Sequence, residues 1–275
     1  MTWKLRQDLL DAANVKLIDM LKCVSRPLNK YIMKKLLLSV LALLVATVGF
    51  AQFNDSDVLQ VGMMNNSEVE QIGWINDSDV LQFGFYNDAE VYQNGLDNKS
   101  LVLQLGAANE ADVEQMGWLN DSFIFQLGVA NKADVGQYGW VNDSDVVQIG
   151  YDNEAYVAQF IHANDSYVNQ FGGDNIVGVL QEGFGNTSTS IQLGHYNGGL
   201  VAQFGVANDS DVWQIGWGNG QWTEQFGWIN DSDVLQVGMY NFSYVHQEGL
   251  GHMSTVVQLG AGNTSSVQQY NGGGF

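Results

Sequence analysis

Glutamine has the most regular spacing in this chain, and its side-chain amide is suited to hydrogen-bond chemistry. It recurs every eleven residues from Gln60 to Gln269, at twenty positions without a gap. An amide carries both a donor and an acceptor, so amides stacked one above another can bond along the stack with no group left unpaired. We therefore interpret the repeated Gln as a structural ladder and not as a catalytic group.

Each Gln belongs to an eleven-residue unit that also has fixed ends. An Asn begins every unit from Asn54 to Asn263 except at His252, and a Gly closes every unit except at Ile161 and Asn271. A fixed period of this kind predicts a repeat architecture.

The other residues with chemical potential form no recognisable enzyme site. The histidines His162, His195, His246 and His252 fall at different points of the unit, which argues against a metal site or a general base. No Ser can be singled out as the partner of a His and an Asp. The twenty units contain no insertion that could build a cleft. We predict no catalytic residue, no cofactor and no metal ligand, and hence a protein that is not an enzyme.

Aspartates form the most regular set of charges. They come from five copies of Asn-Asp-Ser-Asp-Val and are Asp55, Asp57, Asp77, Asp79, Asp143, Asp145, Asp209, Asp211, Asp231 and Asp233. Their spacing does not match a calcium loop. Three interpretations stay open: a solvated face, a row of like charges that slows premature pairing, or a site for divalent cations.

Strands must position these residues, because alternate positions of each unit are constrained. Counting from the Asn, positions two, four, six and eight are Ser or another small residue, Val, Gln and Gly. Period-two alternation rich in Val predicts a strand with one interior face. We expect the Gly and the residues before the next Asn to form the turn, where Gly allows backbone angles closed to other residues.

The true period is twice as long, because Ser marks position two of every second unit, while Ala is the commonest residue there in the alternate units. The predicted fold is therefore all-β: a two-sheet β-solenoid (β-helix) of about ten 22-residue strand-turn-strand coils, about 48 Å long at about 4.8 Å per coil. The predicted structural ladder includes Asn54, Ser56, Val58, Gln60, Gly62, Asn76, Ser78, Val80, Gln82, Gly84, Asn142, Gln148, Asn230 and Gln236.

A solenoid has two ends, and each presents unpaired backbone groups unless an atypical cap covers it. The sequence shows no such cap. End-to-end contact between copies does not close on itself, so it propagates into a filament. The predicted polymerisation ends are Val58 and Gln60 in the first strand and Val267 and Gln269 in the last.

Apolar residues are expected to form an outward row beside the acids. The row consists of Leu59, Leu81, Leu103, Phe125, Val147, Trp213, Leu235 and Val257. Aromatic residues of the turns are expected to mark one edge of the rod: Trp74, Trp118, Trp140, Phe184 and Trp228. An exposed stripe of this kind usually marks an interaction surface, unless its side chains pack on one another at the corners.

Composition divides the chain near residue 51. The 275 residues carry a formal charge of −20, yet eight of the ten basic residues precede residue 52. The acidic remainder is a poor match for nucleic acid. Residues 33–51 have the charged, apolar and small-residue regions of a signal peptide, and we expect no membrane span after its removal. The predicted division is an upstream extension (1–32), a signal peptide (33–51) and the repeat solenoid (52–275).

The pattern Asn-x-Ala/Ser-x-Val-x-Gln-x-Gly, alternating with a Ser-marked version over residues 54–270, resembles the repeats of curlins, the secreted subunits of bacterial curli functional amyloid. The segment Val267-Gln268-Gln269-Tyr270 is similar to the closing strand of the family's major subunits. The chain departs from the family in three ways. It has about twice the commonest number of coils, almost no targeting segment after the signal peptide, and an additional tail at 271–275.

The resemblance implies a protein secreted to the bacterial surface that forms extracellular adhesion and biofilm fibres with copies of itself. It also implies two partners, a nucleator subunit and the outer-membrane curli secretion pore. Two alternatives stay open: the chain could itself be a nucleator curlin at the cell surface, or a monomeric solenoid that binds ice or carbohydrate.

Overall fold

The computed structural model describes residues 53–271, which fall in a compact unit of residues 52–275. This unit contains twenty strands and no helix among the described residues. Their bounds are β1 Asp55–Met63, β2 Asn66–Trp74, β3 Asp77–Phe85, β4 Asp88–Leu96, β5 Lys99–Ala107, β6 Glu110–Trp118, β7 Asp121–Val129, β8 Lys132–Trp140, β9 Asp143–Tyr151, β10 Glu154–His162, β11 Asp165–Gly173, β12 Ile176–Phe184, β13 Thr187–His195, β14 Gly198–Val206, β15 Asp209–Trp217, β16 Gly220–Trp228, β17 Asp231–Met239, β18 Phe242–Leu250, β19 Met253–Ala261 and β20 Thr264–Tyr270.

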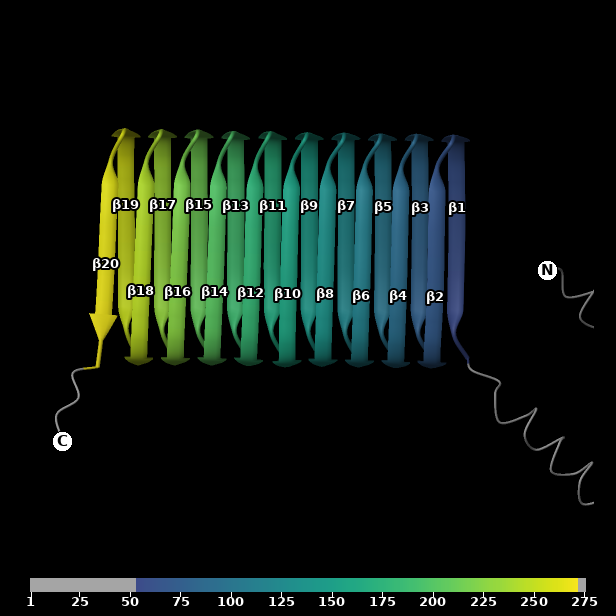
Figure 1. Cartoon of the computed structure of the whole chain (residues 1–275), viewed down its shortest axis with the longest axis horizontal. Coiled ribbons are helices and arrows are strands. Elements are labelled where there is room, and N and C mark those ends of the chain that lie inside the picture. Colours follow the sequence, from purple (N-terminus) through teal and green to yellow (C-terminus); the bar gives the residue numbers. More distant parts are fainter. Residues whose placement is uncertain (1–52, 272–275) are drawn as a thin grey trace, which may run out of the picture. The chain divides into compact units, whose positions relative to one another are not determined.

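The strands form two ten-stranded sheets. Sheet A contains the odd-numbered strands in order from β1 to β19, and sheet B contains the even-numbered strands from β2 to β20. Every pair of neighbours is parallel, and each residue faces its equivalent one coil later, as Gln60 faces Gln82 in sheet A and Gln71 faces Gln93 in sheet B. Figure 1 shows the resulting coils side by side along one axis. The predicted β-solenoid of about ten coils is confirmed.

The core between the sheets is a set of columns of like residues. Val forms most of the apolar columns, with Ile124 in one coil and the polar residues Ser190 and Thr223 in two others, and Ala occupies position two in four strands of sheet B, β4, β6, β8 and β10. The Asn and Gln columns are fully buried through the interior coils, including Asn76, Gln82 and Gln148. The inward face of Asn, Ser, Val and Gln is buried in the interior coils, whereas Ser56, Val58 and Gln60 in β1 at the open end are exposed.

The buried Ser column of sheet A differs from the amide columns. Its hydroxyls have no hydrogen-bond partner through the interior coils of the described chain, for example at Ser78, Ser122 and Ser144. A buried hydroxyl without a partner costs free energy. Small size, and not hydrogen bonding, is therefore what Ser contributes at this position.

The corners differ from the expected turns. The closing Gly lies inside the strand and keeps the same register, as Gly106 does opposite Gly128. Its φ of 128° is in the region that favours Gly, and an added Cβ would collide with the carbonyl oxygen of Gly128. The turn itself is the two residues that follow each strand. The first has φ of 60° at the β-branched Val141 and 58° at Ile229, a conformation that such residues rarely adopt.

The predicted upstream extension (1–32) and the whole of the predicted signal peptide (33–51) lie outside the described residues. The division of the chain into these segments therefore stays a prediction. Among the described residues, no helix is long and apolar enough to cross a bilayer.

Candidate assembly interface

The two ends of the solenoid are the places where its repeating contacts stop. Strands β1 and β2 each have one neighbour, β3 and β4, and at the other end β19 and β20 pair only with β17 and β18. Within residues 53–271 no further element covers either edge. Val58 in β1 is 49% exposed, whereas its equivalent Val80 one coil further in is 0% exposed. The interior face is thus open at both ends.

The predicted polymerisation residues lie on these edges. Val58 and Gln60 are in β1 of sheet A, and Val267 and Gln269 are in β20 of sheet B. They lie at opposite ends of the same chain (Figure 1), so one chain does not bring them together. Whether they carry assembly is a prediction that the geometry of a single chain leaves untested.

Continuing each sheet by one coil shows which residues the prediction missed. The strand order requires β1 of one copy to follow β19 of another, and β2 to follow β20. In the register of the solenoid Val58 would then meet Val256, and Val69 would meet Val267. The missed residues Val69, Gln71, Val256 and Gln258 could have been found by extending the double period past each end. His252, which replaces the Asn at the C-terminal edge of sheet A, is also part of this end.

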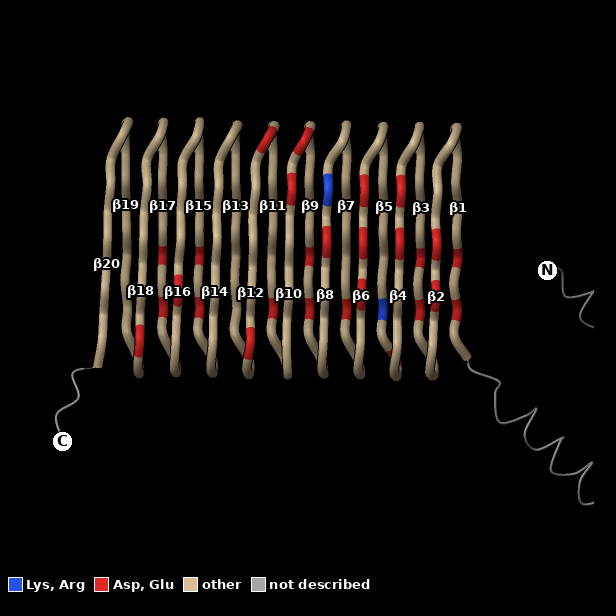
Figure 2. The backbone as a smooth tube through the Cα atoms, viewed as in Figure 1, with Lys and Arg blue, Asp and Glu red and all other residues tan. Residues whose placement is uncertain are grey.

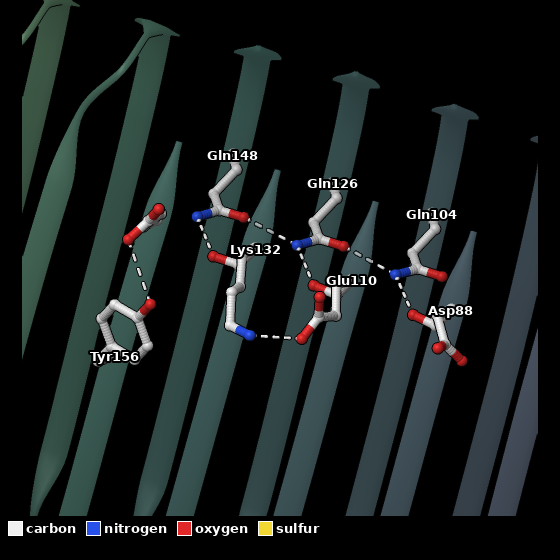
Figure 3. Close-up of polar contacts among 8 residues, drawn as sticks. Asp88, Gln104, Glu110, Gln126, Lys132, Gln148 and Tyr156 are labelled. Carbon is white, nitrogen blue, oxygen red and sulfur yellow. Dashed lines mark hydrogen bonds and ion pairs between the residues drawn. The ribbon is translucent and has the colours of Figure 1, made fainter. Parts of the chain in front are cut away.

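The Gln columns have a direction. Gln104 Nε2 donates to Gln126 Oε1 (2.9 Å), and Gln126 Nε2 donates to Gln148 Oε1 (2.9 Å), so each amide points its donor toward the C-terminal end. The same nitrogen of Gln126 also donates to the main-chain oxygen of Glu110 in the opposite sheet at 2.7 Å. Figure 3 shows these bonds in three successive coils of sheet A. The ladder thereby ties the two sheets together as well as the coils.

The Asn columns run the other way. Asn98 Nδ2 donates to Asn76 Oδ1 at 3.1 Å, and Asn120 donates to Asn98 at the same distance, so these donors point toward the N-terminal end. The Asn98 amide also donates to the main-chain oxygen of Gly117 at 3.0 Å. The Asn therefore secures the corner where the closing Gly bends the strand.

The direction of the Gln columns makes the two ends complementary. Gln60 and Gln71 donate into the chain, and no described residue donates to their Oε1 atoms. At the other end Gln258 and Gln269 each accept a bond from the preceding Gln and donate one bond to a main-chain oxygen. The second amide hydrogen of each has no acceptor among the described residues. A donor end would meet an acceptor end in a head-to-tail stack.

Charge distinguishes the ends as well. Asp55 and Asp57 in β1 and Glu68 and Glu70 in β2 lie on the N-terminal edge. Strands β19 and β20 contain no charged residue. Like charges about 5 Å apart in water repel by roughly 1 kcal/mol before screening by salt. An acidic edge therefore stacks on a neutral edge at less electrostatic cost than on a second acidic edge.

The outward acids form columns along sheet A (Figure 2). Asp143 stands between Asp121 and Asp165 in neighbouring strands. Its partial burial, and then the carboxylates of Asp145, Asp165 and Asp121, raise its pKa to about 6. The described residues contain no group of three or more His, Cys, Asp or Glu side chains placed to hold a metal ion.

The outward apolar residues also lie in register. The predicted row from Leu59 to Val257 forms one column of sheet A, five positions after each Asn. The turn aromatics lie along one edge of sheet B, where Trp118 stacks on Trp140 with ring centroids 5.2 Å apart. Lys132 of β8 forms an ion pair with Glu110, which faces it in the neighbouring strand β6.

Fold and ends together define a parallel two-sheet β-solenoid built from one short repeat. A model of the curlin associated repeat matches residues 106–139, from the end of β5 to the end of β8. Residues 106–139 are therefore similar to the curlin associated repeat, and the predicted resemblance is confirmed. No curated protein matches the chain. The curlin repeat indicates a curli-type subunit, and the fold is consistent with a structural, non-enzymatic role.

Proposed function

We propose that this chain is a secreted structural subunit that polymerises end to end into curli-like functional amyloid fibres, which serve adhesion and the biofilm matrix. The observation that carries the proposal is the pair of open, complementary edges. The edge of β1 and β2 continues the edge of β19 and β20 in strand direction, in register and in the direction of its Gln columns.

Stacking supplies a driving force for growth. Val58, Val69, Val256 and Val267 would each gain the neighbour that equivalent residues have inside the solenoid. Complete burial of a fully exposed Val side chain is worth about 1.5–3 kcal/mol, so Val58, which is 49% exposed, would contribute about half of that, and Val256, which is 5% exposed, almost nothing. New backbone hydrogen bonds add to this gain, because open strand edges are templates for pairing. Each added copy re-creates the same edge, so growth does not terminate.

The proposal includes export. A signal peptide at 33–51, passage through an outer-membrane curli secretion pore and a nucleator subunit at the cell surface are parts of the proposed function. They rest on the sequence pattern of the leader and on the curlin repeat.

A matched pair of variants in β20 tests the mechanism. Val267 points into the core, whereas its neighbour Ser266 is exposed. The protein is expressed from its full-length sequence, recovered as the cell processes it, and diluted from denaturant onto wild-type seeds. We expect Val267→Lys to abolish fibre growth measured by thioflavin fluorescence, because it places a charge in the junction. Ser266→Lys should extend the seeds.

Fibre diffraction of the wild-type product should give one reflection at about 4.7 Å and another at about 10 Å. A wild-type protein that stays a soluble β-rich monomer for days would refute the proposed function. Normal growth of Val267→Lys would show that assembly does not use the strand edge.

A further inference from the structure

Sheet A carries an apolar surface that the solenoid itself does not cover. Two outward columns, five and seven positions after each Asn, begin at Leu59 and Val61 and end at Val257 and Leu259. We call these two columns the apolar stripe. Asn169 is its one polar member. Leu127 in the middle of the rod is 40% exposed, and Leu259 at its end is 67% exposed.

The stripe is confined to one sheet. The same two columns of sheet B contain glutamates, including Glu70, Glu114, Glu182 and Glu248. The fold does not require apolar residues at these outward positions, since sheet B carries charged residues there. The difference between the two outward faces is thus a property of the sequence and not of the fold.

The stripe is large enough for a stable contact with a second copy. Ten coils at about 4.8 Å and four residues at about 3.3 Å give a patch of about 48 by about 13 Å, or about 600 Å². Two such patches face to face bury about 1,200 Å², which reaches the range of specific protein–protein interfaces. The apolar patches of ordinary monomers are seldom larger.

Head-to-tail growth would extend the stripe without a break. At a junction Val257 and Leu259 of one copy would adjoin Leu59 and Val61 of the next, and all four are apolar. A filament would therefore carry an apolar surface along its whole length. This step rests on the proposed function.

The acids determine how two stripes can face each other. In sheet A they occupy the first half of seven of the ten strands, as at Asp209 and Asp211, and are absent from β5, β13 and β19, while the stripe occupies the second half (Figure 2). If facing strands run in the same direction, the acid columns of the two copies oppose each other across sheets about 10 Å apart, which is about one Debye length at 0.1 M salt, so their repulsion is only partly screened. If facing strands run in opposite directions, stripe meets stripe and the acids lie at opposite margins. In that second arrangement the two copies are related by a two-fold axis that lies between the rods and parallel to them, so both rods point the same way.

We propose that two filaments of this chain pair through the apolar stripes of their A sheets, in parallel, to give a two-stranded fibre. The partner is a second copy of the chain, which presents the same stripe with the opposite strand direction. Parallel pairing allows both filaments to grow from the same end, so the contact extends with each added pair of subunits.

Mass per length, measured by scanning transmission electron microscopy, tests this pairing. Wild-type fibres are expected to contain two chains per solenoid length, which is about 48 Å. Leu127→Lys places an ammonium in the stripe, and we expect it to give fibres of one chain per solenoid length, because a buried unpaired charge is costly. The matched control is Met116→Lys, at the equivalent position of sheet B with 39% exposure, which should keep two chains.

The outcomes separate the two proposals. Absence of wild-type fibres refutes the proposed function. Wild-type fibres with one chain per solenoid length refute the pairing and leave the proposed function intact. Loss of pairing in both variants, or in neither of them, has the same meaning. If Leu127→Lys forms no fibre, a wild-type cross-section by cryo-electron microscopy decides. Contact between the sheets of odd-numbered strands supports the pairing, and contact through the even-numbered strands refutes it.

Discussion

Replacing Gln126 by Leu is expected to destabilise the solenoid, because Leu has nearly the volume of Gln but no amide. The change breaks three bonds of the Gln126 amide: the bond from Gln104, the bond to Gln148 and the bond to the main-chain oxygen of Glu110. Two fully buried polar groups then lose their partners: the amide hydrogen of Gln104 and the Oε1 atom of Gln148. Each orphaned buried group costs about 1–3 kcal/mol, so the free energy of unfolding should fall by about 2–6 kcal/mol.

The ladder geometry also predicts how two such changes combine. The adjacent pair Gln104→Leu and Gln126→Leu again leaves two orphaned amide groups, now on Gln82 and Gln148. It also breaks the bond from Gln104 to the main-chain oxygen of Asp88, so it should cost more than one substitution but clearly less than two. The separated pair Gln104→Leu and Gln192→Leu leaves four such groups and should cost about twice as much as one substitution.

Unfolding in guanidinium chloride, followed by circular dichroism at concentrations too low for fibre growth, measures these differences. The free energy of unfolding should fall least for the single variant, somewhat more for the adjacent double variant, and by about twice the single-variant amount for the separated double variant. Equal and additive costs for both double variants would refute the reasoning, because they would show that neighbouring amides are energetically independent.

Three further predictions use the same unfolding measurement. Gly106→Ala should lower the free energy of unfolding by several kcal/mol, because the φ of Gly106 is 128° and the added Cβ would collide with backbone. Gly198→Ala, where the Cβ meets open space, should change it by less than about 1 kcal/mol. Similar effects of the two changes would contradict the role assigned to the closing Gly at the corner. Ser144→Ala should be neutral or stabilising by up to about 1 kcal/mol, because the buried hydroxyl has no partner, and a clear loss of stability would reveal a bond. Stability should rise as pH falls from 7 to 4.5, because the pKa of Asp143 is raised to about 6 in the folded chain, well above its unfolded value, so the folded state takes up the proton first. Asp143→Asn should reduce this rise, and an unchanged pH profile would refute the assignment.

The sequence was sufficient for the fold because one period controls every level of it. Gln at eleven-residue spacing, with Val two residues before it, defines the inward face, and the alternation of Ser and Ala defines two strands per coil. In-register stacking then follows, since only a shift of one whole coil places like on like. No long-range contact outside this scheme was needed to predict the sheets.

The corners and the ends could not be predicted in the same way. Propensity argues against Ile75 or Val141 in a left-handed conformation, and stacking overrides it at these exposed turns. The closing Gly was expected in the turn, but its register with Gly in the next coil places it in the strand. The edge partners Val69 and Val256 were missed because a single chain shows no contact between its ends.

The opposite directions of the two amide columns have an electrostatic consequence. Each Gln side chain contributes a dipole along the rod in one sense, and each Asn side chain contributes one in the other sense. Parallel strands add little, because sheets have small net dipoles. Every coil thus carries opposed amide dipoles that largely compensate each other. The amide columns therefore add little to any potential difference between the ends of a stack, however long the stack becomes.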